Sequence, residues 1–117
     1  MTFQDTISFE QRSEESQRIR EKYPNRVPIV CQKHPSAQKD VPTLAKNKYL
    51  VPSDLTVAQF MYVIRKRIKM KPSTALFMFI NDQLPVAADL VGGVYAKHKS
   101  DDGFLYVYYA AENTFGT

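Results

Sequence analysis

The sequence contains no tryptophan, one cysteine and only four glycines among its 117 residues. A lone cysteine cannot form an internal disulfide bond, so a disulfide scaffold is excluded and a reducing compartment, the cytoplasm, is expected. The scarcity of glycine excludes collagen. No apolar run approaches the roughly 18 residues of a membrane-spanning helix, and the polar start lacks a secretory pattern. A chain of this length buries enough surface to fold as one compact domain.

Basic residues are in modest excess: the chain has 16 basic and 12 acidic residues and a formal net charge of +4. This excess is compatible with nucleic acid, acidic membranes or acidic protein segments and does not choose among them. The densest basic run lies at residues 65–71, and its ordinary interpretation is a solvated helix face. Nucleic-acid binding is not expected, because the aromatic residues that it would use fall mostly in strands that must fill a core.

The N-terminal part differs from the rest of the chain. Residues 9–22 are charged and polar, with few apolar side chains. Ser8 and Gln11 have the spacing of a capping box at the start of a helix, and Pro24 requires the helix to end before it. We interpret residues 1–24 as a helical extension.

Hydrophobic periodicity predicts a domain at residues 25–110. Strands are predicted at residues 26–32, 48–51, 75–80 and 104–109, and helices at residues 57–68 and 89–98. This order is ββαββ with a short extra helix, which is typical of an α+β domain with the ubiquitin-like β-grasp fold. Pro28 suggests that the first strand is an edge strand. Residues 111–117 are expected to form a flexible tail.

The helix at residues 57–68 carries the clearest pattern. Thr56 and Gln59 form a predicted capping box at its start. Its core-facing stripe comprises Val57, Phe60, Met61, Ile64 and Ile68. Val63 and Arg67 lie just outside this stripe, so an apolar and a basic side chain meet at its rim.

Cys31 and His34 are close in sequence but do not predict a thiol nucleophile and its base. Cys31 has the same strand parity as Val27 and Ile29, and an apolar core raises the pKa of a thiol and leaves it inert. No Cys, His or carboxylate pair has zinc-site spacing, and no segment has the pattern of a phosphate-binding loop. We therefore expect neither an enzyme nor a bound metal or cofactor.

Several segments together resemble one family across residues 9–117. They are RVP at 26–28, KYLVPSDLTV at 48–57, QF at 59–60, IRKRI at 64–68 and FGT at 115–117. The chain is similar to the autophagy-related ubiquitin-like modifiers of the GABARAP type. The resemblance implies a β-grasp domain with two N-terminal helices and a short C-terminal extension.

The resemblance also implies processing at the C-terminus. In this family a dedicated cysteine protease cuts after the glycine that follows an aromatic residue. Here these residues are Phe115 and Gly116, and only Thr117 would be removed. E1-like and E2-like enzymes would then join Gly116 to phosphatidylethanolamine and anchor the protein to the autophagosomal membrane. Glycine suits such thioester transfers because it has no side chain to obstruct a catalytic cysteine.

An edge strand at residues 48–51 predicts a binding surface for extended peptides, which add to such strands through backbone hydrogen bonds. An aromatic-x-x-aliphatic motif places its two anchors on opposite sides of the strand, so two pockets are needed. Strand parity and the resemblance predict a first pocket formed by Ile19, Pro28, Val30, Lys48, Leu50 and Phe104. They predict a second pocket formed by Tyr49, Val51, Pro52, Leu55, Phe60, Val63 and Arg67. The alternative is that Tyr49, Val51 and Phe60 simply belong to the core.

Basic residues around these pockets are expected to attract the acidic residues of such motifs. They are Arg26, Lys46, Lys48 and Arg67. The principal hypothesis is a conjugated modifier that recruits cargo receptors. The alternative is a non-conjugated β-grasp module that uses residues 65–71 to bind an acidic partner, such as tubulin tails or a receptor loop.

Two segments depart from the family pattern. Residues 33–47 look longer and richer in proline than in close relatives, and Gly103 stands where a bulky residue often precedes the phenylalanine. The partner preference of the first pocket therefore stays open.

Overall fold

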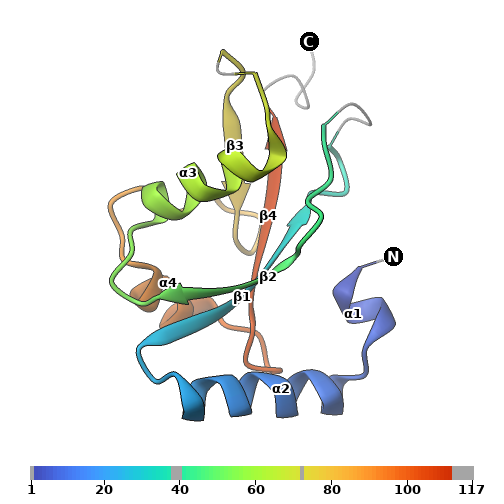
Figure 1. Ribbon diagram of the computed structural model, residues 1–117, viewed down its shortest axis with the longest axis vertical. Helices are drawn as coiled ribbons and strands as arrows, with labels where there is room; N and C mark the ends of the chain where they lie inside the picture. The colour runs from blue at the N-terminus through green and yellow to red at the C-terminus, as the bar shows by residue number, and fades with distance from the viewer. Residues whose placement is uncertain (1, 38–40, 72, 112–117) are drawn as a thin grey trace.

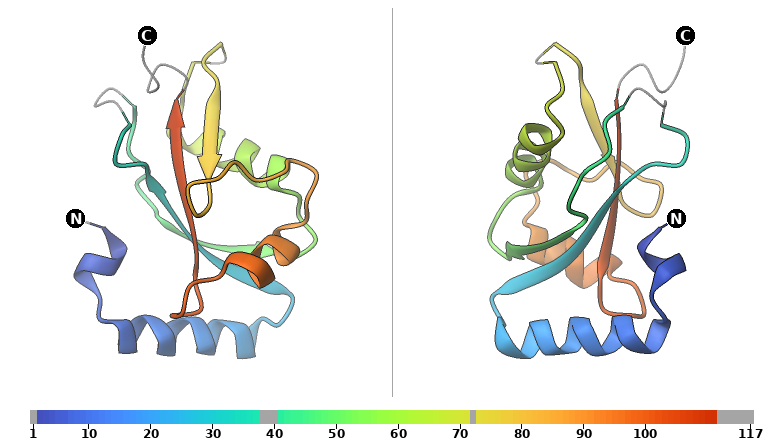
Figure 2. Two further views of the ribbon diagram at one scale, coloured as in Figure 1. Left: turned by 180° about the vertical axis from the view of Figure 1, so that it is seen from behind. Right: turned by 45° about the vertical axis from the view of Figure 1, so that its right-hand side comes forward.

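The architecture is a mixed sheet with helices on both sides, seen in a computed structural model that describes residues 2–37, 41–71 and 73–111. The elements are α1 (Phe3–Thr6), α2 (Phe9–Lys22), β1 (Arg26–Lys33), β2 (Lys48–Pro52), α3 (Val57–Ile68), β3 (Leu76–Phe79), α4 (Val91–His98) and β4 (Leu105–Ala111). This order confirms the predicted β-grasp fold and its two preceding helices. Figures 1 and 2 show α3 and α1 on opposite sides of the sheet, with α2 running across its lower end.

The four strands lie in the order β2-β1-β4-β3. β1 is antiparallel to β2 and parallel to β4, and β3 is antiparallel to β4. The prediction that Pro28 marks an edge strand is therefore wrong, because β1 is central. The Cys31 N–H bonds to the Asn47 carbonyl on the β2 side, so the Pro28 nitrogen, of opposite parity, faces β4. Pairing with β4 begins only at Ile29, and the missing N–H of proline costs no ladder hydrogen bond.

β1 is buried on both faces. Val27, Ile29 and Cys31 belong to the main core beneath α3. Val30 belongs to a smaller core with Phe3 of α1 and other residues of the N-terminal helices. The near-continuous apolar sequence of the strand follows from this two-sided burial.

α3 confirms the predicted cap. The Thr56 hydroxyl accepts from the Gln59 N–H, and the Gln59 side chain accepts from the Thr56 N–H, which completes the capping box. Four residues of the predicted stripe are buried, namely Val57, Phe60, Ile64 and Ile68. Met61 is only partly buried against them. The helix ends at Lys69, whose backbone has a left-handed conformation with φ of 54°.

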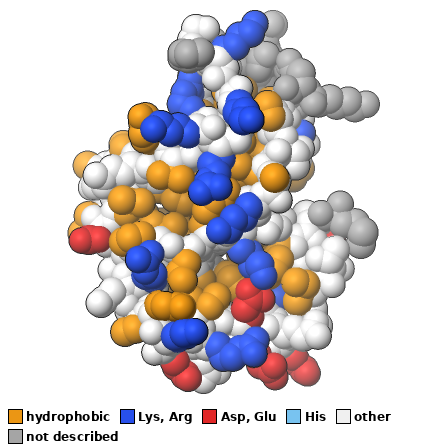
Figure 3. All heavy atoms as spheres, viewed as in Figure 1, with side chains coloured by type: hydrophobic (Ala, Val, Ile, Leu, Met, Phe, Trp, Pro, Cys, Tyr) orange, Lys and Arg blue, Asp and Glu red, His pale blue; other side chains and the backbone are white. Residues whose placement is uncertain are grey.

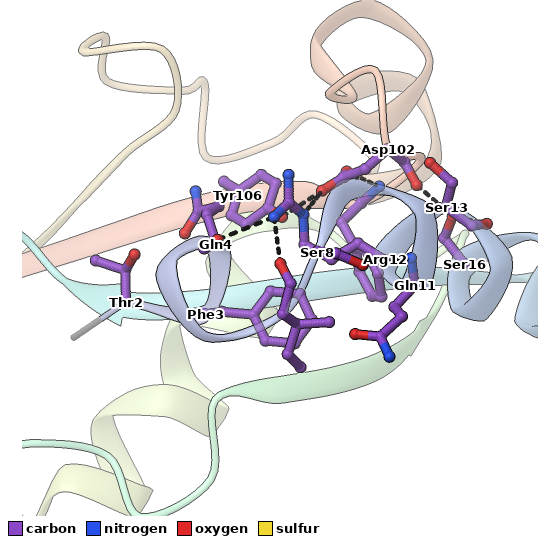
Figure 4. A network of polar contacts seen from close by, with 12 residues as sticks. Thr2, Phe3, Gln4, Ser8, Gln11, Arg12, Ser13, Ser16, Asp102 and Tyr106 are labelled. Carbon is purple, nitrogen blue, oxygen red and sulfur yellow. Dashed lines mark hydrogen bonds and ion pairs between the residues drawn. The ribbon is translucent and has the colours of Figure 1, made fainter.

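The N-terminal helices are attached to β4 through Asp102. Its carboxylate accepts hydrogen bonds from Arg12 Nε at 2.9 Å, from the Tyr106 hydroxyl at 2.5 Å and from the Phe104 N–H at 2.9 Å (Figure 4). Its backbone carbonyl accepts a bond from the Ser16 hydroxyl of α2. Burial raises the pKa of Tyr106, and the bond to Asp102 and the charge of Asp102 raise it further. Tyr106 therefore stays protonated at neutral pH and donates to the buried carboxylate.

β4 is longer than predicted at its C-terminal end. The sequence analysis assigned Ala111 to the tail, and this is wrong: Ala111 pairs with Leu76 of β3 and is 3% exposed. Small alanine side chains followed by polar residues carry little hydrophobic signal, but β3 needs a partner along its whole length. Residues 112–117 of the predicted tail lie outside the described residues.

Gly103 allows α2 to approach β4 closely. Its φ is +89°, and a Cβ at this position would overlap Ser16 Oγ. We expect Gly103→Ala to lower the free energy of unfolding by about 2 kcal/mol, from backbone strain and the displaced helix. Urea denaturation measures this change. Gly93→Ala is the matched control, because an added Cβ there meets nothing within 4 Å; equal effects of the two substitutions would contradict the prediction.

Candidate functional site

β2 has the geometry of a strand that accepts an added peptide. The strand order places it at one edge of the sheet, where its outer backbone edge has no described strand beside it. Its side chains alternate in burial, with Tyr49 and Val51 buried toward the main core and Leu50 half-buried on the other face. The predicted edge strand and its two-sided arrangement are therefore present in the fold.

One face of β2 carries residues predicted for the first pocket. Leu50 lies opposite Pro28, and Lys48 lies opposite Val30, in the antiparallel register. Val30 and Phe104 form one hydrophobic cluster, against which the half-buried Ile19 of α2 packs. Pro28, Val30 and Phe104 are nearly inaccessible, so the accessible part of the predicted first pocket comes from Ile19, Lys48 and Leu50.

The other face carries residues predicted for the second pocket. The rings of Tyr49 and Phe60 meet edge to face, with centroids 6.0 Å apart. Tyr49, Phe60 and Val51 are all buried in the main core, and Leu55 packs partly buried against it. The core packing of Tyr49, Val51 and Phe60 is the alternative stated above, and Val63 on α3 is 38% exposed at the rim of the core-facing stripe.

Of two further residues predicted for the second pocket, Arg67 lies near Tyr49, whereas Pro52 has the parity of the opposite face. Burial raises the pKa of Tyr49, and the nearby positive charge of Arg67 partly opposes this shift, so Arg67 lies within electrostatic reach of the ring. Pro52 has the strand parity of Lys48 and Leu50 and pairs with Arg26. Strand alternation therefore does not bring Pro52 to the second pocket.

The basic residues around β2 already have partners within the chain. Lys48 Nζ forms an ion pair with Glu15 Oε2 at 2.8 Å. Lys46 Nζ lies 5.5 Å from the centroid of the Tyr49 ring, and Arg26 Nη1 donates to the Leu50 carbonyl at 3.3 Å. Figure 3 shows Lys and Arg side chains spread among hydrophobic surface on the face that carries α3 and β2.

Glu15 is the residue that the sequence analysis missed. It lies four positions before Ile19 on α2, and residues at this spacing share one face of a helix. This helical spacing from Ile19 is the signal that could have indicated an acidic side chain beside the predicted first pocket. Its carboxylate partly neutralises Lys48, the basic residue closest to the first pocket.

Some side chains of the basic run at residues 65–71 form contacts within the chain. The Arg65 guanidinium donates to the carbonyls of Lys71 at 3.0 Å and of Thr74, which fixes the turn after α3. Lys66 Nζ lies 4.6 Å from the centroid of the Tyr62 ring. Both observations favour the interpretation of a solvated helix face over a dedicated acidic-partner site.

Cys31 has the inert environment that was predicted. Its side chain is inaccessible in the main core, and burial raises the pKa of the thiol. His34 instead contacts Ser36 Oγ through Nδ1 at 2.7 Å, and its Nε2 lies 3.9 Å from Asp82. The pair thus has no geometry for nucleophilic catalysis.

The predicted processing and conjugation residues, Phe115, Gly116 and Thr117, lie outside the described residues. Within residues 2–37, 41–71 and 73–111, no helix has the length and apolar character required to cross a bilayer.

Comparison with known proteins gives consistent matches over nearly the whole chain. The family described as autophagy protein Atg8, ubiquitin-like, matches residues 11–116. Autophagy-related protein 8 of Schizosaccharomyces pombe is 58% identical over 115 residues, which cover 98% of this chain and 93% of the relative. The protein of the same name from Mycosarcoma maydis is 55% identical over 114 residues, covering 97% and 95%.

Solved structures agree with these matches. The crystal structure of Trypanosoma brucei ATG8 superposes with a TM-score of 0.91 at 40% identity, covering 99% of this chain and 98% of that one. Plasmodium falciparum Atg8, in complex with a Plasmodium falciparum Atg3 peptide, has a TM-score of 0.86 at 29% identity, covering 94% and 95%. The second protein binds a peptide in its solved structure.

Proposed function

Because this chain belongs to the Atg8 family of ubiquitin-like autophagy proteins, we propose that it is a conjugated modifier and adaptor of autophagosome formation. A cysteine protease removes Thr117, and E1-like and E2-like enzymes transfer Gly116 to phosphatidylethanolamine. The lipid-anchored protein then gathers cargo receptors on the autophagosomal membrane. It is a substrate of these enzymes and carries no catalytic group of its own.

The observation that carries the adaptor function is the open edge of β2, whose side chains alternate between the faces of the two predicted pockets. An added peptide strand would bond to the backbone of β2, and its alternating side chains would enter the first and second pockets. Residues predicted for both pockets belong to the two cores, and close packing restricts their movement. The basic residues at the rim complement acidic residues in the motif and speed the encounter.

Two observations support conjugation. The chain has the aromatic-glycine sequence at residues 115–116 that the family uses for processing. A relative with the same fold was solved with a peptide of Atg3, so a surface of this fold accepts a peptide of that protein. We propose that the β2 edge also receives the E2-like enzyme of this chain.

The alternative is a non-conjugated module that binds acidic partners such as tubulin tails through residues 65–71. The commitment of Arg65 to backbone carbonyls makes this surface less available. The two functions differ in their dependence on Gly116, which only the conjugated modifier requires.

Lys48→Glu combined with Leu50→Ala tests the adaptor function. We expect at least a tenfold loss of affinity for an acidic aromatic-x-x-aliphatic peptide, because the variant loses the Leu50 side chain from the first pocket and places a second carboxylate beside that of Glu15. Calorimetric titration measures this loss. Lys97→Glu with Leu84→Ala is the matched control, since both residues are exposed and line a different cavity.

An unchanged affinity in the Lys48/Leu50 variant, or an equal loss in the control, would remove the β2 edge as the binding surface. Thermal denaturation of both variants separates loss of binding from loss of fold. Lys48 is exposed and Leu50 is only half-buried, so the fold is expected to persist.

A further inference from the structure

Phe3 belongs to the same hydrophobic cluster as Val30 and Phe104, two residues predicted for the first pocket. It is 5% exposed, although it lies in the four-residue helix α1 near the start of the chain. Its ring meets the Phe104 ring edge to face, with centroids 5.3 Å apart. Lys48 Nζ lies 5.6 Å from the centroid of the same ring, and Val30 belongs to the same cluster.

The contacts that hold α1 in place are few and mostly polar. The Phe3 N–H donates to Gln32 Oε1 at 2.9 Å, and Gln4 Nε2 donates to the Tyr108 hydroxyl at 3.3 Å. Arg12 Nη1 donates to the carbonyls of Gln4 at 3.0 Å and Ile7 at 2.6 Å (Figure 4). A helix of four residues has no stability of its own, so burial of the Phe3 ring is the main apolar anchor of α1.

Lys48 connects this anchor to the binding surface. Its ammonium group is shared between the Glu15 carboxylate and the face of the Phe3 ring. An acidic residue of a bound motif would compete with both for the same positive charge. Binding at the first pocket would therefore weaken a contact that helps to hold Phe3.

We propose that Phe3 is a resident occupant of the inner end of the first pocket and determines which aromatic side chain a motif can insert there. With Phe3 in place the pocket is shallow and suits a single ring. When Phe3 withdraws together with α1, the floor made by Val30 and Phe104 becomes accessible and the pocket accepts the larger indole of tryptophan. This selection rests on the proposed binding of aromatic-x-x-aliphatic motifs at β2.

Withdrawal also reduces apparent affinity, because a ligand that requires the open pocket binds only the fraction of molecules in which Phe3 has left. A tryptophan motif must supply the binding energy to displace Phe3, whereas a phenylalanine motif need not. Phe3 therefore lowers the affinity for tryptophan motifs relative to that for phenylalanine motifs, and does not change both affinities equally.

The test compares two acidic peptides that differ only in having tryptophan or phenylalanine at the aromatic position. Calorimetric titrations use the full chain, Phe3→Ala and Phe3→Leu. We expect Phe3→Ala to raise affinity for the tryptophan peptide about tenfold and to change affinity for the phenylalanine peptide by less than about twofold. Phe3→Leu refills the space and should keep the preference of the unchanged chain.

Gln32→Ala is a second variant that leaves every predicted pocket residue intact. It removes the hydrogen bond to the Phe3 N–H and the contact with Gln4 Oε1 at 3.2 Å. It should shift the tryptophan-to-phenylalanine ratio in the same direction as Phe3→Ala, by a smaller factor. This variant separates release of α1 from loss of the phenylalanine side chain itself.

An equal loss of affinity for both peptides in Phe3→Ala would show that Phe3 is a wall touched by every motif, and unchanged affinities for both peptides would show that it lies outside the pocket. Either result overturns the proposal and leaves the proposed function in place. If neither the unchanged chain nor any variant binds either peptide, the proposal that such motifs bind at β2 is wrong. The proposed role of Phe3, which depends on it, is then wrong as well.

Discussion

Gly116→Ala is expected to abolish the membrane-bound form of the protein. In each thioester the carbonyl carbon of the terminal residue is bonded to the sulfur of a catalytic cysteine. The next nucleophile, a cysteine thiol or finally the lipid amine, attacks this carbon and displaces the thiolate, and a methyl group on the terminal residue obstructs that attack. The measurement is the intact mass of the protein recovered from the membranes and the soluble fraction of a eukaryotic cell. The unchanged chain should give a membrane form that ends at Gly116 and carries the mass of a phospholipid.

Thr117→Ala is the matched control for this experiment. The proposed processing removes residue 117, so this variant should yield a membrane form of the same mass as that of the unchanged chain. Full-length, unmodified protein in every fraction would contradict conjugation. The proposal of peptide binding at the β2 edge would then remain, and the non-conjugated adaptor would become the better hypothesis.

Asp102→Asn is expected to lower the free energy of unfolding by about 3 kcal/mol, because it leaves the Arg12 guanidinium without its counter-charge in a largely buried setting. The amide also replaces one acceptor oxygen with a donor group facing other donors. Asp102 accepts from Arg12, Tyr106 and the Phe104 N–H while being 3% exposed. Urea denaturation measures the change.

Asp101→Asn provides the control, because Asp101 is the exposed neighbour of Asp102. A surface substitution of this kind should change the free energy of unfolding by less than about 0.5 kcal/mol. A comparably small effect of Asp102→Asn would mean that the carboxylate is not what attaches the N-terminal helices to β4. Hydrogen exchange of α2 amides would then be expected to stay unchanged as well.

Local patterns predicted the elements well wherever one physical signal dominated. The Thr56–Gln59 cap and the apolar stripe of α3 depend on spacing along a single helix, and both are present. The burial of Cys31 followed from strand parity. These features need no knowledge of what lies on the other side of the sheet.

The errors arose where the partner of a segment decided its role. Pro28 reads as an edge residue by its own chemistry, but β1 is central, and only the offset at which β4 begins makes proline acceptable there. Ala111 has a weak hydrophobic signal, but it pairs with Leu76 and is buried. Neither fact follows from residues within a few positions in the sequence.

The features of the candidate surface also separate into those that the sequence determined and those that the tertiary structure decided. The sequence by itself determined the β-grasp order, the alternation of β2 and the sequence at residues 115–116, because each depends on neighbouring residues or a short motif. Only the tertiary structure decided that Glu15 pairs with Lys48 and that Phe3 enters the cluster of Val30 and Phe104. These contacts join residues far apart in the chain, and their free energy comes from burial and charge pairing that exist only once the helices have packed on the sheet.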